Sequence, residues 1–142
     1  MKRYLSTKNI FTISILWATA LAMLILLILG IRRGNLGLFP IVALSLVISL
    51  IIWTLLDTRY VIKNGNLLYR SGPFRGRINI QSILKIQKFS GMNPPVTFKP
   101  ALDYNGFIIT YNKSENVYVS PKMSSNFISE LLKINPNIII NS

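Results

Sequence analysis

Two long apolar runs separated by a short basic break constrain this chain more than any other feature. Residues 10–31 and 36–56 contain no charged side chain, and the break between them carries Arg32 and Arg33. Because a helix rises about 1.5 Å per residue, each run can cross a hydrocarbon core of roughly 30 Å. A single segment satisfies its backbone hydrogen bonds in lipid by forming a helix. The sequence therefore predicts transmembrane helices at 10–31 and 36–56, joined by an extracytoplasmic loop at 32–35.

The distribution of lysine and arginine around these runs predicts the orientation of the hairpin. Residues 1–9 carry three basic side chains and the twenty residues after the second run carry four, against two in the loop. Basic residues accumulate on the cytoplasmic side of membrane helices. We therefore expect a multi-pass membrane protein with both termini in the cytoplasm, and residues 1–9 as an N-terminal tail. A cleaved signal peptide is the alternative, but its apolar core is only about 7–15 residues long.

The remaining chain, over residues 57–138, alternates short strand-like segments with turn signals. Asn64-Gly65 favours a two-residue hairpin because both positions tolerate positive φ angles, and Gly72-Pro73 favours a tight turn. These turns, together with polar residues later in the chain, separate six segments that we predict to be short strands. The segments are 59–63, 66–71, 75–79, 82–89, 106–111 and 117–120.

One amphipathic helix is predicted after the last strand. Ser120 and Pro121 have the residue types of an N-cap and a first helical residue, and Asn135-Pro136 ends the helix. Its apolar face comprises Phe127, Leu131 and Ile134, with Ile128 and Leu132 beside them. The fold class is therefore α+β, with an N-terminal two-helix transmembrane hairpin, a small strand-rich domain at 57–138 and a tail at 139–142.

Several motifs of the strand-rich domain resemble the bacterial PH-like domain family typified by the YyaB-like proteins. The resemblance covers about residues 58–138. It implies a PH-like antiparallel β-barrel or sandwich capped by one C-terminal helix, in a membrane-anchored member of the family that lies in the inner membrane of a bacterium. The family has no general assigned activity, so the resemblance implies a fold and a location rather than a reaction. The motifs are Arg70-Ser-Gly-Pro-Phe-Arg75, Ile78-Asn-Ile-Gln-Ser-Ile83, Val119-Ser-Pro-Lys122, Phe127 with Leu131, and Asn135-Pro-Asn137.

The residue types needed for catalysis are scarce. The chain has no histidine and no cysteine, and its four carboxylates are Asp57, Asp103, Glu115 and Glu130, far apart in the sequence. We therefore predict a protein that is not an enzyme, with no cofactor, no metal and no small-molecule substrate. The net charge of +12 is typical of nucleic-acid-binding proteins, but an anionic membrane leaflet also attracts basic residues. We expect no nucleic-acid partner.

Binding is the function class that remains, and two groups of residues are candidates for it. The first hypothesis is an interaction module for a protein partner of unknown identity, bound by strand addition to an open sheet edge. The alternatives are a sensor of anionic lipid through the basic strands, and an immunity protein that protects the membrane against a toxic peptide. The candidate lipid- or partner-binding residues are Lys63, Arg70, Arg75, Arg77, Lys85 and Lys88.

A proline-rich segment at 90–103 is the second candidate, because functional residues are often placed on loops. The other interpretation of its apolar residues is that they cover an open end of the sheet. The candidate partner-loop residues are Met92, Val96, Phe98, Lys99 and Leu102.

Overall fold

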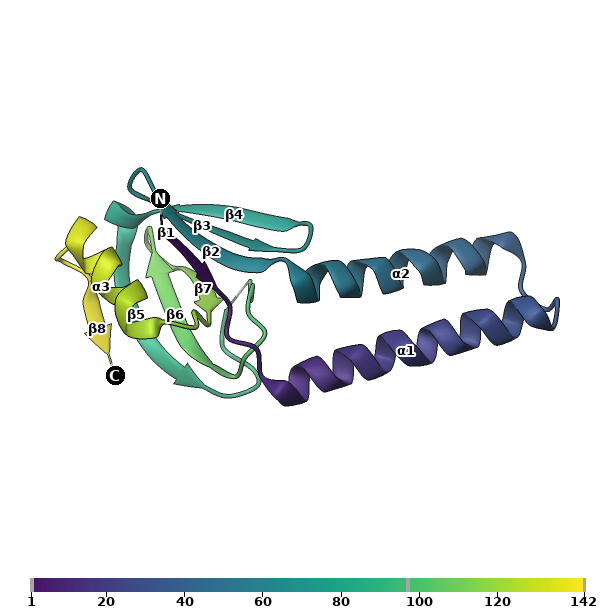
Figure 1. Cartoon of the computed structure of the whole chain (residues 1–142). Coiled ribbons are helices and arrows are strands. Elements are labelled where there is room, and N and C mark those ends of the chain that lie inside the picture. The colour runs from purple at the N-terminus through teal and green to yellow at the C-terminus, as the bar shows by residue number, and fades with distance from the viewer. Residues whose placement is uncertain (1, 97, 142) are drawn as a thin grey trace.

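The computed structural model of the chain describes residues 2–96 and 98–141. A helical hairpin leaves one end of a two-sheet sandwich (Figure 1). The hairpin consists of α1 (Ile10–Arg32) and α2 (Leu38–Leu56). Both helices are long and apolar enough to cross a membrane. Most of their side chains are exposed on all sides, which suits helices surrounded by lipid rather than by protein.

Several polar side chains of the hairpin form hydrogen bonds within their own helix. The Asn9 side chain accepts a hydrogen bond from the Phe11 amide at 2.9 Å and caps α1. Inside the helices, Thr19 and Ser45 donate their hydroxyls to carbonyls four residues earlier, each at 2.8 Å. A hydroxyl bonded to its own helix needs no partner from lipid. Pro40 lies in the first turn of α2, as its missing amide hydrogen predicts.

The first sheet is an antiparallel meander in the order β1-β2-β3-β4. It corrects the prediction that residues 1–9 are a tail, because Lys2–Leu5 forms β1 and pairs with β2. Tyr4 explains this placement, since its side chain is buried and its ring meets Phe127 edge-on at 5.3 Å. The hairpin of α1 and α2 therefore forms the connection between β1 and β2. The other three strands are β2 (Thr58–Lys63), β3 (Asn66–Ser71) and β4 (Phe74–Asn79).

The second sheet follows a short 3-10 turn, η1 (Ile80–Ser82), and has the order β7-β6-β5-β8. Residues 139–142 were predicted to be a tail, but Ile139–Asn141 forms β8, which runs parallel to β5. Met1 and Ser142, at the outer ends of the two predicted tails, and Thr97, in the predicted loop, lie outside the described residues. The strands are β5 (Ile83–Ser90), β6 (Asn105–Tyr111), β7 (Glu115–Val119) and β8 (Ile139–Asn141).

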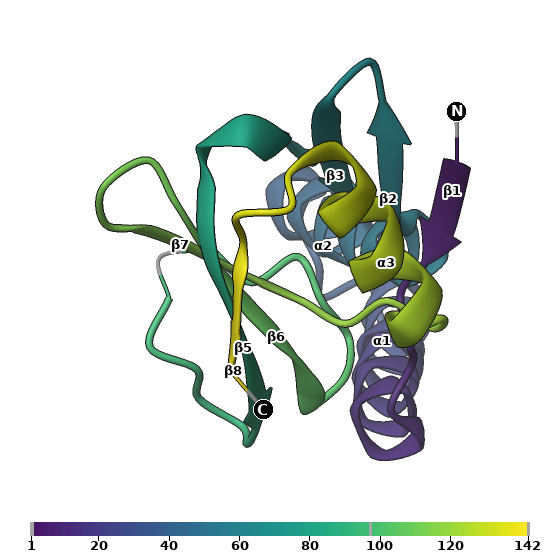
Figure 2. The same cartoon turned by 90° about the vertical axis from the view of Figure 1, so that its left-hand side faces the viewer.

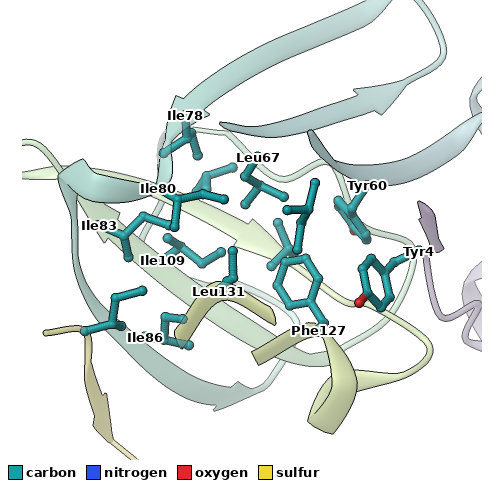
Figure 3. Close-up of a cluster of buried hydrophobic side chains, with 14 residues drawn as sticks. Tyr4, Tyr60, Leu67, Ile78, Ile80, Ile83, Ile86, Ile109, Phe127 and Leu131 are labelled. Carbon is teal, nitrogen blue, oxygen red and sulfur yellow. The ribbon is translucent and has the colours of Figure 1, made fainter. Parts of the chain in front are cut away.

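The core lies between the two sheets and α3 (Ser124–Ile134). Figure 2 shows α3 beside β1, β2 and β3 of the first sheet, and Figure 3 shows Phe127 and Leu131 of α3 among the isoleucines and tyrosines of the strands. The two sheets have separate strand orders, so the domain is a sandwich and not a closed barrel. The predicted α+β fold, with a helical hairpin, a PH-like sandwich and a C-terminal helix, is confirmed.

The start of α3 differs from the prediction. Ser120 was expected to cap the helix, but α3 begins at Ser124 with Met123 as its N-cap. The reason is long-range pairing of residues 120–122 with residues 5–7, at and just after the end of β1. The Thr7 amide donates to the Ser120 carbonyl at 2.6 Å, and the Lys122 amide donates to the Leu5 carbonyl at 2.9 Å. These bonds and the bridge between Pro121 and Ser6 hold residues 120–122 against residues 5–7, so the helix starts later.

The end of α3 agrees with the prediction and has a clear cause. Asn135 is the C-cap and is buried. Its side-chain amide donates to the carbonyl of Ile80 at 3.0 Å and to that of Ile83 at 3.1 Å. This side chain therefore fixes the end of α3 to the turn that connects the two sheets.

Candidate functional site

The outer face of the first sheet gathers basic side chains from four strands. Side chains that alternate along a strand point to opposite faces, and paired residues share a face. Tyr4, Tyr60 and Tyr69 occupy paired positions on the core side. The intervening residues therefore point outward. The basic members of this surface, called the basic face below, are Arg3, Arg59, Lys63, Arg70, Arg75 and Arg77.

Arginines stand side by side across this face. Arg59 of β2 pairs with Arg70 of β3, which in turn pairs with Arg75 of β4. A hollow of about 270 Å³ lies at this row. Its lining includes the three arginines and the apolar side chains of Val61 and Leu68. Like charges opposite one another destabilise a sheet. This row therefore costs stability unless an anion neutralises it.

One carboxylate offsets part of this charge. Asp57, between α2 and β2, forms an ion pair with Arg59 at 3.2 Å and a second with Arg70. Among the described residues, Arg75 and Arg77 form no ion pair with a carboxylate, although Arg77 donates to the side chain of Asn66 at 3.0 Å. The charge available for an acidic partner is therefore greatest on β4.

The strand β4 is also the outer edge of its sheet. The order β1-β2-β3-β4 leaves one side of β4 without a strand neighbour in the described chain. Edge strands present unpaired N–H and C=O groups to which another segment can add. An open edge and unpaired arginines thus occur on the same strand.

The basic face extends away from the hairpin. The strand β2 begins at Thr58, directly after α2, and Figure 1 shows β2, β3 and β4 running from the hairpin end toward the opposite end of the sandwich. Four residues separate Arg59 from Lys63, a rise of about 13 Å in a strand. Only the row of Arg59, Arg70 and Arg75 therefore lies near the level at which α2 ends.

The structure brings together some of the predicted basic residues and separates others. Four of the six predicted side chains belong to the basic face. Lys85 and Lys88 do not, because they lie on β5 of the second sheet. Sequence reasoning missed Arg3 and Arg59. Arg59 could have been found, because it alternates with an apolar residue, Tyr60, in a predicted strand. Arg3 could not, because residues 1–9 were not expected to form a strand.

The predicted loop of residues 90–103 lies mainly against the sandwich. The Phe98 ring is 5.6 Å from that of Tyr69 and 5.8 Å from that of Phe74, so it covers the side of the domain near β3 and β4. Leu102 is buried. Met92 is 71% exposed, and Val96 is half-buried. The five predicted loop residues therefore do not form one exposed patch.

Lys99, the charged member of the predicted loop, lies over aromatic rings. Its ammonium is 5.5 Å from the ring centroid of Tyr104 and 5.3 Å from that of Tyr118. Partial burial lowers the pKa of Lys99, and the charge of Asp103 acts in the opposite direction. The cation–π contacts keep this side chain on the domain surface.

A cluster of buried polar groups joins, by hydrogen bonds, the segments that lead into the hairpin. The Tyr60 hydroxyl donates to the Pro100 carbonyl at 2.6 Å and accepts from the Ser120 amide at 3.1 Å. The hydroxyls of Ser6 and Ser120 are 3.0 Å apart. Burial raises the pKa of Tyr60, so its hydroxyl stays a neutral donor. The cluster connects β2, the proline-rich loop and the segment before α1.

The carboxylates have separate partners in the structure. Asp103 is buried and accepts hydrogen bonds from the amides of Tyr104 and Asn105. Glu130 forms ion pairs with Lys2 and Lys133. Within residues 2–96 and 98–141, no three side chains of His, Cys, Asp or Glu lie together as a potential metal site.

Comparisons with known proteins agree with this architecture. The model of the family described as "Bacterial PH domain" matches residues 58–135. The chain is 30% identical over 118 residues to the protein named "Uncharacterized protein YyaB" of Bacillus subtilis (strain 168), covering 80% of this chain and 76% of that protein. No solved structure matches.

Proposed function

This chain belongs to the bacterial PH domain family, and from that premise we propose that it is a non-enzymatic interaction module held at the inner face of the cell membrane. PH domains are generally interaction modules, and two helices here are apolar enough to span a membrane. The basic face is the surface proposed to bind. Its occupant is an acidic segment of a partner protein, which pairs with the open edge of β4 and places carboxylates beside Arg75 and Arg77.

One observation carries this proposal: within the described residues, the strand β4 has both arginines without a carboxylate partner and an edge without a neighbouring strand. Arg75 and Arg77 alternate with the core-side residues of the strand and have no carboxylate partner among the described residues. An added strand would gain main-chain hydrogen bonds from β4, and its carboxylates would form charge-assisted bonds with the arginines. Both sources of affinity act on one extended acidic segment.

A protein partner fits the basic face better than a flat lipid surface does. The strands run away from the hairpin, so the face stands alongside the bilayer normal in the proposed arrangement (Figure 1). The surface potential of an anionic leaflet falls off within a Debye length, about 8 Å at physiological ionic strength. Lys63 lies beyond that distance from the row of Arg59, Arg70 and Arg75, since four strand residues span about 13 Å.

The proposed location follows from charge and from strand pairing. The basic residues before α1 and after α2 outnumber the two in the connecting loop, which favours cytoplasmic termini. The pairing of β1 with β2 also requires both ends of the hairpin to lie on one side of the membrane. An inner membrane protein with both termini in the cytoplasm meets both conditions.

Site-specific crosslinking in the native membrane tests the proposal. A photo-crosslinking amino acid at Leu68, on the floor of the basic face, should yield one protein adduct. The charge reversal Arg75→Glu with Arg77→Glu should abolish that adduct. The same reversal at Lys85 and Lys88, on the second sheet, should leave it in place, and this pair is the matched control.

Two results would contradict the proposal. An adduct that persists in the Arg75→Glu, Arg77→Glu variant would show that the basic face does not select the partner. An adduct with phospholipid alone would favour the lipid-sensor alternative over an acidic protein segment.

A further inference from the structure

A hollow lies between the two points at which the helices leave the sandwich. It measures about 450 Å³ and is lined by Leu5, Ser6, Thr7, Lys8, Leu56, Thr58 and Lys122. These residues come from three parts of the chain, namely the segment before α1, the end of α2 with the start of β2, and the segment before α3. Figure 1 shows both helices leaving the same end of the domain. The lining residues next to the start of α1 and the end of α2 place the hollow at this end.

The hollow is amphipathic. Leu5 is 59% exposed and Leu56 is 69% exposed, and two leucines left open to water at one site are unfavourable. Lys8 and Lys122 are both exposed, and no carboxylate is among the lining residues. Within the described chain, neither lysine forms an ion pair. The site therefore offers two positive charges beside apolar surface.

The hollow lies at the level of the lipid headgroups in a bilayer that α1 and α2 would cross. Leu56 is the last residue of α2, and Lys8 lies two residues before the start of α1. Apolar side chains at the helix ends meet acyl chains, and lysines next to them reach the phosphates. The N-terminus of α1, which begins at Ile10, adds a partial positive charge on the same side.

We propose that this hollow binds the headgroup of one anionic phospholipid. Lys8 and Lys122 pair with its phosphate, and the start of its acyl chains contacts Leu5 and Leu56. The size fits, because pockets for small ligands measure roughly 300 to 1,000 Å³. This lipid is distinct from the partner of the basic face, since none of the six basic residues of that face lines the hollow.

Such a lipid would contact both ends of the hairpin at once. Ser6 and Thr58 line the hollow, and the Ser6 amide donates to the Thr58 carbonyl at 3.3 Å. A ligand at this position spans the junction where β1 and β2 continue into α1 and α2. Bound lipid is therefore expected to stabilise the attachment of the domain to its hairpin.

Native mass spectrometry of the full-length protein in detergent tests the proposal. The probes are phosphatidylglycerol, which is anionic, and phosphatidylcholine, which has no net charge. The wild type should retain one phosphatidylglycerol and release phosphatidylcholine. The double variant Lys8→Gln with Lys122→Gln should bind phosphatidylglycerol about tenfold or more weakly, and Lys8→Arg with Lys122→Arg should restore binding.

The matched control is Lys113→Gln with Lys133→Gln. It removes the same net charge from the β6–β7 turn and from the last turn of α3, and it should retain the lipid. The thermal midpoint of each variant, measured without lipid, separates lost binding from lost folding, and the arginine variant keeps the test valid if the glutamine variant unfolds.

Three outcomes would overturn the proposal. The first is equal retention of phosphatidylglycerol by the wild type and the glutamine variant. The second is equal retention of phosphatidylcholine and phosphatidylglycerol by the wild type. The third is complete displacement of the lipid by excess inorganic phosphate, which would indicate a site for free anions. None of these outcomes depends on the protein partner of the basic face.

Discussion

Removing one buried hydroxyl should loosen the connection between the sandwich and its hairpin. Tyr60→Phe keeps the ring, which is 6.2 Å from that of Phe127, and deletes only the oxygen. The Pro100 carbonyl then loses a donor at 2.6 Å, and the Ser120 amide loses an acceptor at 3.1 Å. Both groups lie in the interior, so water does not replace the lost bonds freely.

The magnitude follows from these two groups. Each buried group left without a partner costs about 1–3 kcal/mol, and partial relaxation toward the nearby Ser6 hydroxyl reduces the sum, so we expect about 2 to 4 kcal/mol. For a domain of this size, such a loss lowers the thermal midpoint by roughly 10 to 20 °C. The hairpin should remain helical, because its own hydrogen bonds are local.

Thermal proteolysis of the full-length protein in detergent measures this midpoint for the domain. Trp17 and Trp53 are both in the hairpin, so tryptophan fluorescence would not report on the sandwich. The matched control is Tyr118→Phe. Tyr118 is equally buried, but its hydroxyl has no hydrogen-bond partner in the described residues, so its removal should leave the midpoint unchanged or higher.

Comparing the two variants shows whether the hydrogen bonds of the Tyr60 hydroxyl stabilise the domain. If Tyr60→Phe melts with the wild type, the cluster around Tyr60 does not hold the segments together. If both variants lose the same stability, the loss does not come from the hydrogen bonds of the Tyr60 hydroxyl.

Three further predictions concern orientation, the end of α3 and pH. The natural chain has no cysteine, so a membrane-impermeant thiol reagent should label Asn35→Cys in intact cells and Lys113→Cys only after lysis; the reverse pattern would invert the proposed topology. Asn135→Ala removes donors from two buried carbonyls and should lower the free energy of unfolding by about 1–3 kcal/mol in a denaturant titration; an unchanged midpoint would contradict its clamping role. Lys133 and then Lys2 lower the pKa of Glu130, so its stabilising effect is present at neutral pH and lost as the pH falls through the lowered pKa; the thermal midpoints of the wild type and Glu130→Gln should therefore converge on acidification.

Much of the fold could be predicted because its signals are local. Asn64 and Gly65 both adopt positive φ angles, of 51° and 70°, as their residue types favour. Gly72 has a φ of 57° and lies against Thr54 of α2, where a side chain would collide. Turn chemistry of this kind depends on one or two residues, so strand boundaries near the turns agreed with the structure.

The candidate site was harder to predict, because it depends on the register of four strands. Arg70, Arg75 and Arg77 were recognised as basic residues of neighbouring segments. Their common face with Arg3 required the pairing of β1 with β2, which brings together residues on opposite sides of the whole hairpin. Lys85 and Lys88 have the same local pattern but belong to the other sheet.

The sequence by itself determined the two apolar helices, because crossing a hydrocarbon layer sets a requirement on length and composition that any window of the chain reveals. Only the tertiary structure decided what the chain ends and Ser120 do. Ser120 has the residue type of a helix cap, yet its hydroxyl meets that of Ser6, 114 positions away in the sequence. A hydrogen bond over that separation forms only when the sandwich has closed around its core, so no local pattern records it.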